Sequence, residues 1–508
     1  MRAPEGPPTA APFVVIEVDG VLHVEQRAKV QGGEHVTHWE AFAAVEHYYK
    51  PGRRDEPIPL YSGPFTLTQQ GKPDRPCHGT VIFVWYPQPR IVIAGSWDQH
   101  VTAEDIMGLL GTSNEYWVGP SGCLLPATGV LPPPPALDDL GGQDPDGGRL
   151  TFERPTNVVL VGDTDAFDEV TFLIPNGPEI WDGPEAAVAT DPGRRVPGHL
   201  FVAATGWELT IDPRMDGDSS DRRKELAKQG GHDVTHVGRL RRVNGGSFDD
   251  ETTYEVLTFV RLALSLATGR TTPCLLPVGW RQGVPVGARW NGAPIDPYEG
   301  STNWMDPTIG NAQLSELLQH TLESCVDPVR RGVIRQAIQF LVTANVDVDV
   351  ELQVALPISA LQMLSFYRFV TDRETMSRSA FESMKGKWGG TDAQVRMLLQ
   401  DCKIDTDVPA HMQHLKSARD GIDPQRDALA TVNCLRNKII HPTVKLSTEW
   451  TIYEWAEAGV VARYYLTLTI LNTLGYQGQI YSDLRMPRDL GNVEPVPWAT
   501  PAATTEGP

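Results

Sequence analysis

The chain has 508 residues, of which 41% are hydrophobic and 21% charged, proportions that exclude a wholly disordered protein. This length favours two or three domains over one. The formal net charge of -20 excludes a protein that attracts nucleic acid over its whole surface, so any contact with RNA must be local.

Cysteine usage and hydropathy exclude further classes. The six cysteines show no CxxC spacing, which argues against a zinc site. They are also too sparse for a disulfide framework in a chain of this length. Residues 1–12 lack the apolar stretch of a signal peptide, and no charge-free apolar run reaches the roughly 18 residues of a transmembrane helix. We therefore expect a cytoplasmic protein with no membrane partner.

Residues 1–304 are predicted to form a β-rich region. Short runs rich in β-branched residues, bounded by Gly and Pro, recur along it at 13–18, 80–86, 90–95, 158–162, 169–174, 199–203, 275–278 and 284–290. The runs at 80–86 and 90–95 flank a Pro-containing turn and predict a hairpin. One amphipathic helix is expected at 253–267, ended by Gly269. The polar segments 131–148 and 212–231 are predicted to be irregular loops.

The pattern changes near residue 305, where apolar residues begin to recur at helical spacing. Helices are predicted around 314–322, 333–343, 361–370, 395–399, 425–440 and 450–474. We therefore expect an α+β multidomain protein, with an all-α helical bundle at 305–490 behind the β-rich region. Residues 491–508 are expected to be an irregular tail.

The helix predicted after Pro424 carries a polar cluster beside its apolar stripe. The stripe consists of Leu429, Val432, Leu435 and Ile439. Asn437 and His441 are four residues apart and share one face, with Arg436 beside them. Pro442 places His441 at the helix end, because a residue before proline avoids the α conformation.

This cluster has the groups that RNA cleavage needs without a metal or cofactor. A histidine such as His441 titrates near neutral pH and can take the proton of a ribose 2′-OH or protonate the leaving oxygen. Arg436 can stabilise negative charge on the attacked phosphate. Asn437 can orient the histidine or hold the phosphate. The three residues are the predicted catalytic group of an endoribonuclease.

A local basic patch surrounds these residues. The segment from Pro424 to Lys445 contains four basic side chains and one acid, Asp427, a net charge of +3 in an acidic protein. Besides Arg436, the basic residues are Arg426, Lys438 and Lys445, which we expect to bind RNA.

Arg436-Asn437 followed by His441 at a helix end resembles the HEPN family (higher eukaryotes and prokaryotes nucleotide-binding). The β-rich region followed by such a domain resembles the ApeA-like anti-phage proteins. The resemblance implies a HEPN-type bundle, a homodimer in which two motifs form one composite site, and an effector of abortive infection. It also implies that the β-rich region senses a phage-derived trigger and regulates cleavage.

Many family members carry an acidic residue on an earlier helix, near the motif. Gln362 occupies the position where this sequence would have it. Glu316, Glu323 and Glu351 are the other candidates, and the sequence does not choose among them.

Other readings stay open. Arg436 and His441 can instead form caps and ion pairs at a helix C-terminus, which favours cations. The alternative function is a non-catalytic HEPN-type sensor that dimerises and binds a partner through its β-rich region. A third hypothesis is a β-domain that binds carbohydrate or another small ligand, joined to a helical oligomerisation module.

Several further histidines are candidate ligands. The pairs at 232/236 and 35/38 have metal-binding spacing, but no acidic or cysteine partner follows at motif spacing, and their segments are predicted to be polar loops. His411 and His414 are expected on a surface loop before the catalytic helix. No metal is predicted.

Overall fold

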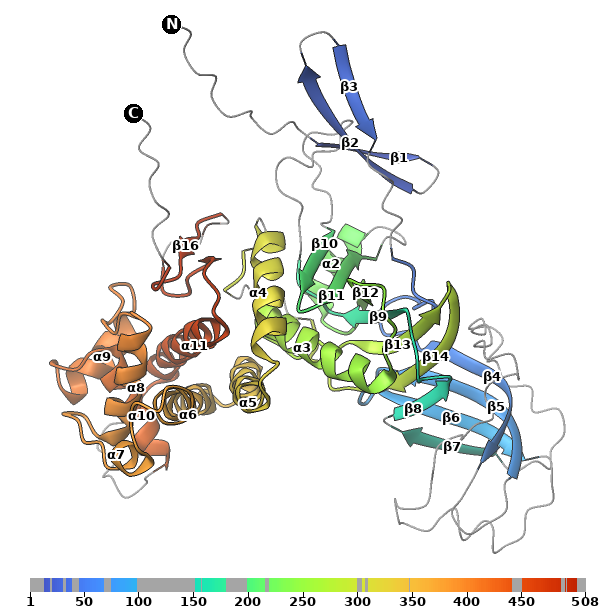
Figure 1. Ribbon diagram of the computed structural model, residues 1–508. Helices are drawn as coiled ribbons and strands as arrows, with labels where there is room; N and C mark the ends of the chain where they lie inside the picture. Colours follow the sequence, from blue (N-terminus) through green and yellow to red (C-terminus); the bar gives the residue numbers. More distant parts are fainter. Residues whose placement is uncertain are drawn as a thin grey trace, which may run out of the picture.

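The computed structural model describes residues 13–18, 21–30, 33–38, 45–67, 75–97, 151–156, 158–179, 199–214, 219–298, 304–306, 309–346, 348–440, 450–485, 489 and 491–499. The predicted loop at 131–148 lies outside these residues. Figure 1 shows strands dominating the first half of the chain and helices the second, so the coarse α+β prediction is confirmed.

The strands form antiparallel sheets. β1 (Phe13–Val18), β2 (Val21–Val30) and β3 (Gly33–His38) make one, and β4 (Ile58–Leu67), β5 (Arg75–Val84), β6 (Arg90–Trp97) and β7 (Thr151–Thr156) make another. The β5–β6 pair, with Val84 opposite Arg90, confirms the predicted hairpin.

A seven-stranded sheet is the largest layer. In spatial order it contains β10 (Leu200–Ala204), β11 (Trp207–Pro213), β12 (Val234–Arg242), β9 (Glu169–Pro175), β13 (Leu275–Arg281), β14 (Val284–Asn291) and β8 (Val158–Gly162). Strand β9 is buried on both faces, since Phe172 and Ile174 pack into one hydrophobic core and Leu173 into the other. Its continuous apolar run follows from this position between two layers.

Gly238 of β12 allows the Phe172 ring of the neighbouring strand β9 to pack closely against its backbone. It lies opposite Phe172 of β9, and a Cβ at Gly238 would stand 2.2 Å from the fully buried Phe172 ring. We expect Gly238→Ala to lower the free energy of unfolding by about 1–3 kcal/mol through overpacking. Chemical denaturation measures this. Gly332→Ala is the matched control: Gly332 is helical with open space around its Cβ position, so a gain of about 0.5–1 kcal/mol is expected.

The described residues of the β-rich region contain two helices where one was predicted. α3 (Asp250–Thr268) confirms the predicted helix, with Asp249 as its N-cap and Gly269 in the left-handed conformation at its end. α2 (Ser219–Gln229) contradicts the loop prediction for 212–231. Its sequence is too polar to show an apolar stripe, and Leu226 alone among its described side chains is fully buried.

The second half of the chain is helical. It contains α4 (Gly310–Ser324), α5 (Pro328–Asn345), α6 (Leu352–Phe366), the π-helical turn η2 (Tyr367–Asp372), α7 (Arg378–Glu382), α8 (Gly390–Asp401), α9 (Gln413–Ile422), α10 (Ala428–Ile440) and α11 (Ile452–Leu474). α6 is central and contacts α5, α8, α10 and α11.

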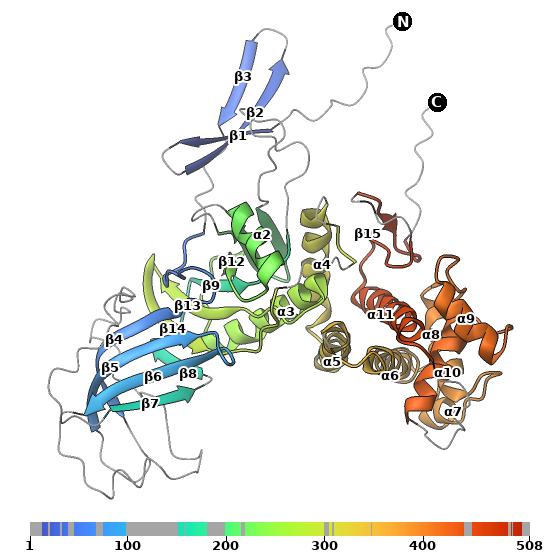
Figure 2. The same cartoon turned by 180° about the vertical axis from the view of Figure 1, so that it is seen from behind.

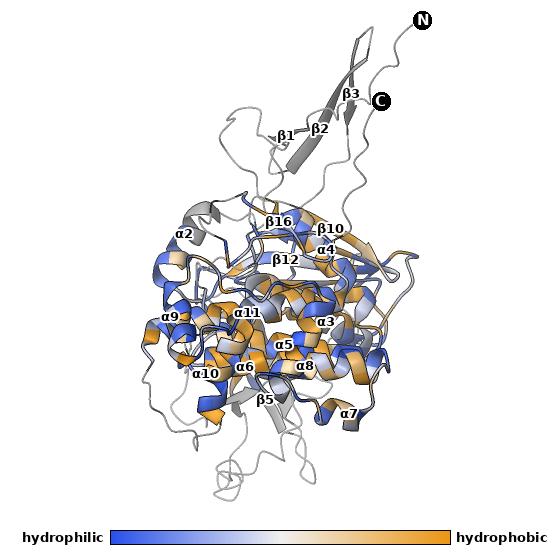
Figure 3. Ribbon diagram, turned by 90° about the vertical axis from the view of Figure 1, so that its left-hand side faces the viewer, coloured by the Kyte–Doolittle hydropathy of each residue, from blue (hydrophilic) through white to orange (hydrophobic). Residues whose placement is uncertain are grey.

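The central position of α6 explains its composition. Figure 3 shows it as predominantly hydrophobic. By length and hydropathy, Leu352–Asp372 is the one helical stretch among the described residues that could cross a membrane, but 56% of its apolar window is buried inside the protein. A helix packed against four others is hydrophobic on most sides for that reason.

The described part of the predicted irregular tail, residues 491–499, contains one two-residue strand and is otherwise irregular, but it packs against the fold. β15 (Gln479–Ile480) pairs with β16 (Glu494–Pro495), close to α11 in Figure 2. Val496 is buried, and the Trp498 indole donates to the Tyr476 carbonyl at 2.7 Å. Residues 500–508 lie outside the described residues.

The helices and the large sheet share one hydrophobic core. That core runs from Phe167 to Val496 and includes α3 and most helices of the second half. The Trp304 indole donates to the Leu266 carbonyl of α3 at 2.9 Å, and Arg331 of α5 pairs with Glu255 of α3. The boundary expected near residue 305 is therefore a change of secondary structure with continuous packing across it.

Candidate functional site

α10 carries the predicted catalytic group and begins later than expected. Its first residue is Ala428, because Asp427 caps the helix: its carboxylate accepts from the Ala430 amide at 2.9 Å. Leu429, Val432 and Leu435 are fully buried, as predicted. Ile439, the fourth residue of the predicted stripe, is partly buried against the core, whereas the neighbouring Ile440 is 42% exposed.

Arg436 is half-buried near the C-terminal end of α10. Its Nη1 donates to the Asn437 side-chain oxygen at 3.1 Å, and its buried Nε has no hydrogen-bond partner among the described residues. Burial lowers the pKa of the Arg436 guanidinium. Within the described ranges no carboxylate pairs with it, so its remaining N–H groups can bind an oxyanion.

Asn433 extends this polar face by one helical turn. It precedes Arg436 by three residues and Asn437 by four, so the three side chains follow one side of α10. Asn433 is only 2% exposed, and neither its amide nitrogen nor its oxygen has a partner among the described residues. Sequence reasoning missed it. A buried amide without partners is uncommon and marks a place where water or a ligand completes the bonding.

The other predicted RNA contacts have structural partners. The Lys438 ammonium lies 3.5 Å from the centre of the Trp450 ring, and the Arg426 guanidinium lies 4.4 Å from that of Trp388. Arg426 also donates to the Ala430 carbonyl at 3.0 Å. These contacts fix both cations beside α10, and their binding to RNA stays a prediction. His441 and Lys445 lie outside the described residues.

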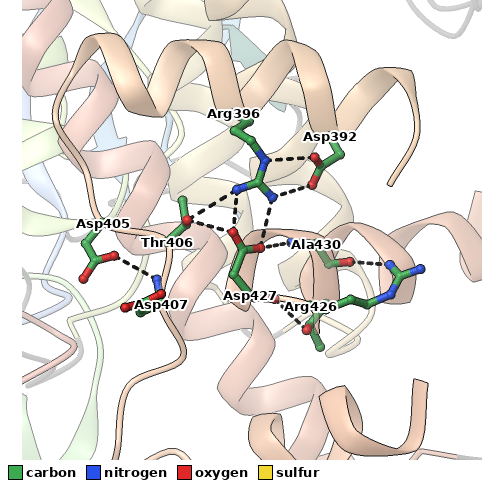
Figure 4. A network of polar contacts seen from close by, with 9 residues as sticks. Asp392, Arg396, Asp405, Thr406, Asp407, Arg426, Asp427 and Ala430 are labelled. Atoms are coloured by element: carbon green, nitrogen blue, oxygen red, sulfur yellow. Dashed lines mark hydrogen bonds and ion pairs between the residues drawn. The ribbon is translucent and has the colours of Figure 1, made fainter. Parts of the chain in front are cut away.

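An ion-pair network anchors the start of α10 (Figure 4). Arg396 of α8 binds Asp427 through both nitrogens of its fork, at 2.5 and 3.0 Å, and binds Asp392 at 3.1 Å. The Thr406 hydroxyl donates to Asp427 at 2.8 Å. We call this network the Asp427 clamp, because the Asp427 carboxylate caps α10 and also pairs with Arg396 of the neighbouring helix α8.

The network shifts the pKa values of its members in the expected directions. The hydrogen bond to Asp427 is the largest cause of the raised pKa of Arg396. Burial alone raises the pKa of the Asp427 carboxyl, but hydrogen bonds from Arg396, the Ala430 amide and Thr406 together leave it below its ordinary value. Asp427 is therefore ionised in the folded protein at neutral pH.

Neither Gln362 nor any of the three candidate glutamates contacts Arg436 through a described interaction. Gln362 donates to the Gln394 side chain at 2.7 Å, and Glu316 accepts from the Gln477 amide at 2.7 Å. Glu323 lies 3.6 Å from His320. Glu351 immediately precedes α6 and makes no side-chain cap there. The identity of an acidic helper remains a prediction.

The described histidines among those with metal-binding spacing, His232 and His236, contact other side chains of the protein. Both are buried: His232 lies in the loop before β12, as predicted, and stacks on Trp85, whereas His236 lies in β12 with its ring 2.9 Å from the Thr235 hydroxyl. Across the described ranges, His, Cys, Asp and Glu side chains form no group of three that could hold a metal. The side chains of His35 and His38 lie outside those ranges.

His414 is also placed differently from the prediction. It lies in the first turn of α9 instead of a loop, and its exposed ring stacks on Tyr453 with centroids 5.1 Å apart. His411 is exposed just before that helix.

Comparison with known proteins relates this chain to one family. Residues 162–301 match the YopA central domain, and residues 327–494 match the YopA C-terminal domain. The chain is 26% identical over 317 residues to the SPbeta prophage-derived uncharacterized protein YopA of Bacillus subtilis (strain 168), a match that covers 61% of this chain and 70% of that protein. No solved structure matches it. The second matched region contains the whole of α10.

Proposed function

We propose that the helical half of this chain is a metal-independent endoribonuclease of the HEPN type. The observation that carries the proposal is Arg436, a half-buried guanidinium without a carboxylate partner among the described residues, five positions before His441. Burying a charged group such as a guanidinium costs free energy unless that group is paired and hydrogen-bonded. An arginine that keeps N–H donors available is suited to binding a phosphate of the substrate.

The proposed reaction is an internal transfer at phosphorus. The ribose 2′-oxygen attacks the adjacent phosphate, a base removes its proton, and the bond from phosphorus to the 5′-oxygen breaks as an acid protonates that oxygen. His441 serves as base or acid. Arg436 binds the phosphate oxygens as charge builds up, and Asn437 holds the Arg436 fork in place. The products are a 2′,3′-cyclic phosphate and a 5′-hydroxyl.

Two chains complete the proposed site. The reaction needs an acid and a base, whereas each chain has one motif histidine, so a homodimer with facing motifs supplies both. The β-rich region is the proposed regulator, since its α3 packs directly on α4 and α5. A role in abortive infection against phage, with a phage-derived trigger, is part of the same proposal. The prophage origin of the YopA relative is compatible with a role in conflict between phages.

The test is cleavage of single-stranded RNA by the purified full chain in excess EDTA. We expect cleavage to persist in EDTA and the products to carry 2′,3′-cyclic phosphate ends, as read by mass spectrometry. Cleavage that needs a divalent metal, or that leaves a 3′-hydroxyl, would contradict the mechanism. Absence of cleavage with extracts of infected and uninfected cells would favour the non-catalytic alternative.

A further inference from the structure

A pocket of about 350 Å³ opens among α6, α7 and α8. Its size falls in the range of small-molecule sites. The lining consists of Ser359, Gln362, Met363, Phe366, Phe381, Glu382 and Gln394. No lysine, arginine or histidine is among these residues, so the pocket does not suit a phosphate.

The polar side of the pocket is held in place by buried hydrogen bonds. Gln394 is only 5% exposed, and its amide nitrogen donates to the Phe381 carbonyl at 2.8 Å. Its oxygen accepts from the Gln362 nitrogen at 2.7 Å. These bonds fix the orientation of both amides. The Gln362 oxygen is left without a partner among the described residues, and so offers an acceptor to a ligand.

Glu382 provides the second acceptor. One of its carboxylate oxygens accepts from Arg378 at 2.7 Å, an exposed pair that leaves the other oxygen open. Phe366 is the partly exposed aromatic side chain of the pocket, and the buried Phe381 ring packs nearly perpendicular to it with centroids 5.4 Å apart. Such a pocket favours a flat, uncharged ring that stacks on an aromatic face and offers N–H donors along one edge.

Guanine fits this description best among the RNA bases. Its Watson–Crick edge presents two adjacent donors, a ring N–H and an amino group, which match the two acceptors of the pocket, the Gln362 oxygen and the open Glu382 oxygen. Adenine, cytosine and uracil each place an acceptor beside their donor on that edge, which would face the Glu382 carboxylate unfavourably. Sequence-specific RNA recognition commonly reads such edges on unstacked bases.

Two of the helices that line the pocket, α6 and α8, also contact α10, the helix that carries the proposed catalytic residues. Gln394 precedes Arg396 by two residues on α8, and Arg396 binds Asp427 at the start of α10. Arg436 follows Asp427 by nine residues, about 14 Å along the helix. We propose that this pocket binds an unpaired guanine of the RNA substrate a few nucleotides from the cut. The proposal rests on the ribonuclease function and names its substrate class.

The test is equilibrium binding of two fluorescein-labelled pentanucleotides, AAGAA and AAAAA, to the full chain by fluorescence anisotropy. Their 2′-O-methyl riboses cannot attack, so binding is measured without cleavage. The wild-type protein should bind AAGAA at least about fivefold more tightly, since one good base contact discriminates by that much. Glu382→Gln keeps the size of the side chain, removes the carboxylate and should abolish the preference. Phe366→Leu should weaken the binding of AAGAA by removing the stacking face.

Two control variants separate the pocket from its surroundings. Glu374→Gln removes an exposed carboxylate outside the pocket and should leave the preference intact. Arg378→Ala removes the ion-pair partner of Glu382 and keeps its carboxylate, so the preference should also remain. Equal affinities for both oligonucleotides in the wild type, or a preference that survives Glu382→Gln, would overturn the guanine pocket. This assay measures binding, whereas the assay in EDTA measures cleavage. The guanine pocket and the ribonuclease function can therefore be contradicted independently.

Discussion

Arg436→Ala is expected to slow RNA cleavage by about 10²- to 10³-fold, the effect of removing one group that stabilises charge in a transition state. The same change should leave the free energy of unfolding unchanged or slightly raised. In the folded protein Arg436 is desolvated, its Nε has no partner among the described residues, and its described hydrogen bond goes to Asn437. A residue retained for stability would show the opposite result, a loss of folding stability at full activity.

The measurement is single-turnover cleavage of a labelled RNA together with thermal unfolding of the same samples. Arg436→Lys keeps the charge and loses the planar fork, so it should recover only part of the rate. Arg335→Ala is the matched control, because Arg335 is an exposed arginine on α5. His441→Ala should reduce the rate by about 10²- to 10⁴-fold, as expected for an acid or base. Normal cleavage by the Arg436→Ala variant would remove the basis of the proposed function.

Asp427→Ala is expected to lower the free energy of unfolding by about 2–4 kcal/mol, because it removes the N-cap of α10 and leaves Asp392 as the one described carboxylate bound to the partly buried Arg396. Asp427→Asn keeps a good cap and loses only the charge, so it should cost about half as much. Asp420→Ala, which removes an exposed partner of Arg419, is the control and should change stability by less than about 0.5 kcal/mol. Denaturant unfolding compares the three variants. Equal stabilities for Asp427→Ala and the wild type would show that the Asp427 clamp contributes nothing.

The contribution of Asp427 should also depend on pH. Burial raises its pKa, but hydrogen bonds from Arg396, Ala430 and Thr406 bring the net value below that of the unfolded chain, about 3.9. A carboxyl with a lowered folded pKa stabilises the fold fully above the unfolded pKa and loses that effect as pH falls through the folded value. The difference in unfolding free energy between the wild type and Asp427→Asn should therefore be largest near neutral pH and shrink below about pH 4. A difference that grows on acidification would contradict this assignment.

Local patterns in the sequence were sufficient for several elements. The apolar stripe of α10, the start of α3 after Asp249 and its end at Gly269, and the β5–β6 hairpin all follow from spacing and turn residues within a few positions. Arg436 and Asn437 could be singled out because Asn437 and His441 are four residues apart, a spacing that shares one helical face, with Arg436 beside them. The polar helix α2 was missed since it has no apolar stripe, and its one fully buried described side chain is Leu226.

The sequence by itself determined that a helix near residues 428–440 presents Arg436 beside Asn437 at its end, because helical periodicity is a local property. Only the tertiary structure decided where that helix begins: the Asp427 carboxylate caps it while bound to Arg396, 31 residues earlier in the chain. The pocket among α6, α7 and α8 and the burial of Asn433 are likewise tertiary. They depend on contacts between distant segments, and no short-range pattern encodes which charges and which helical faces meet once the core is packed.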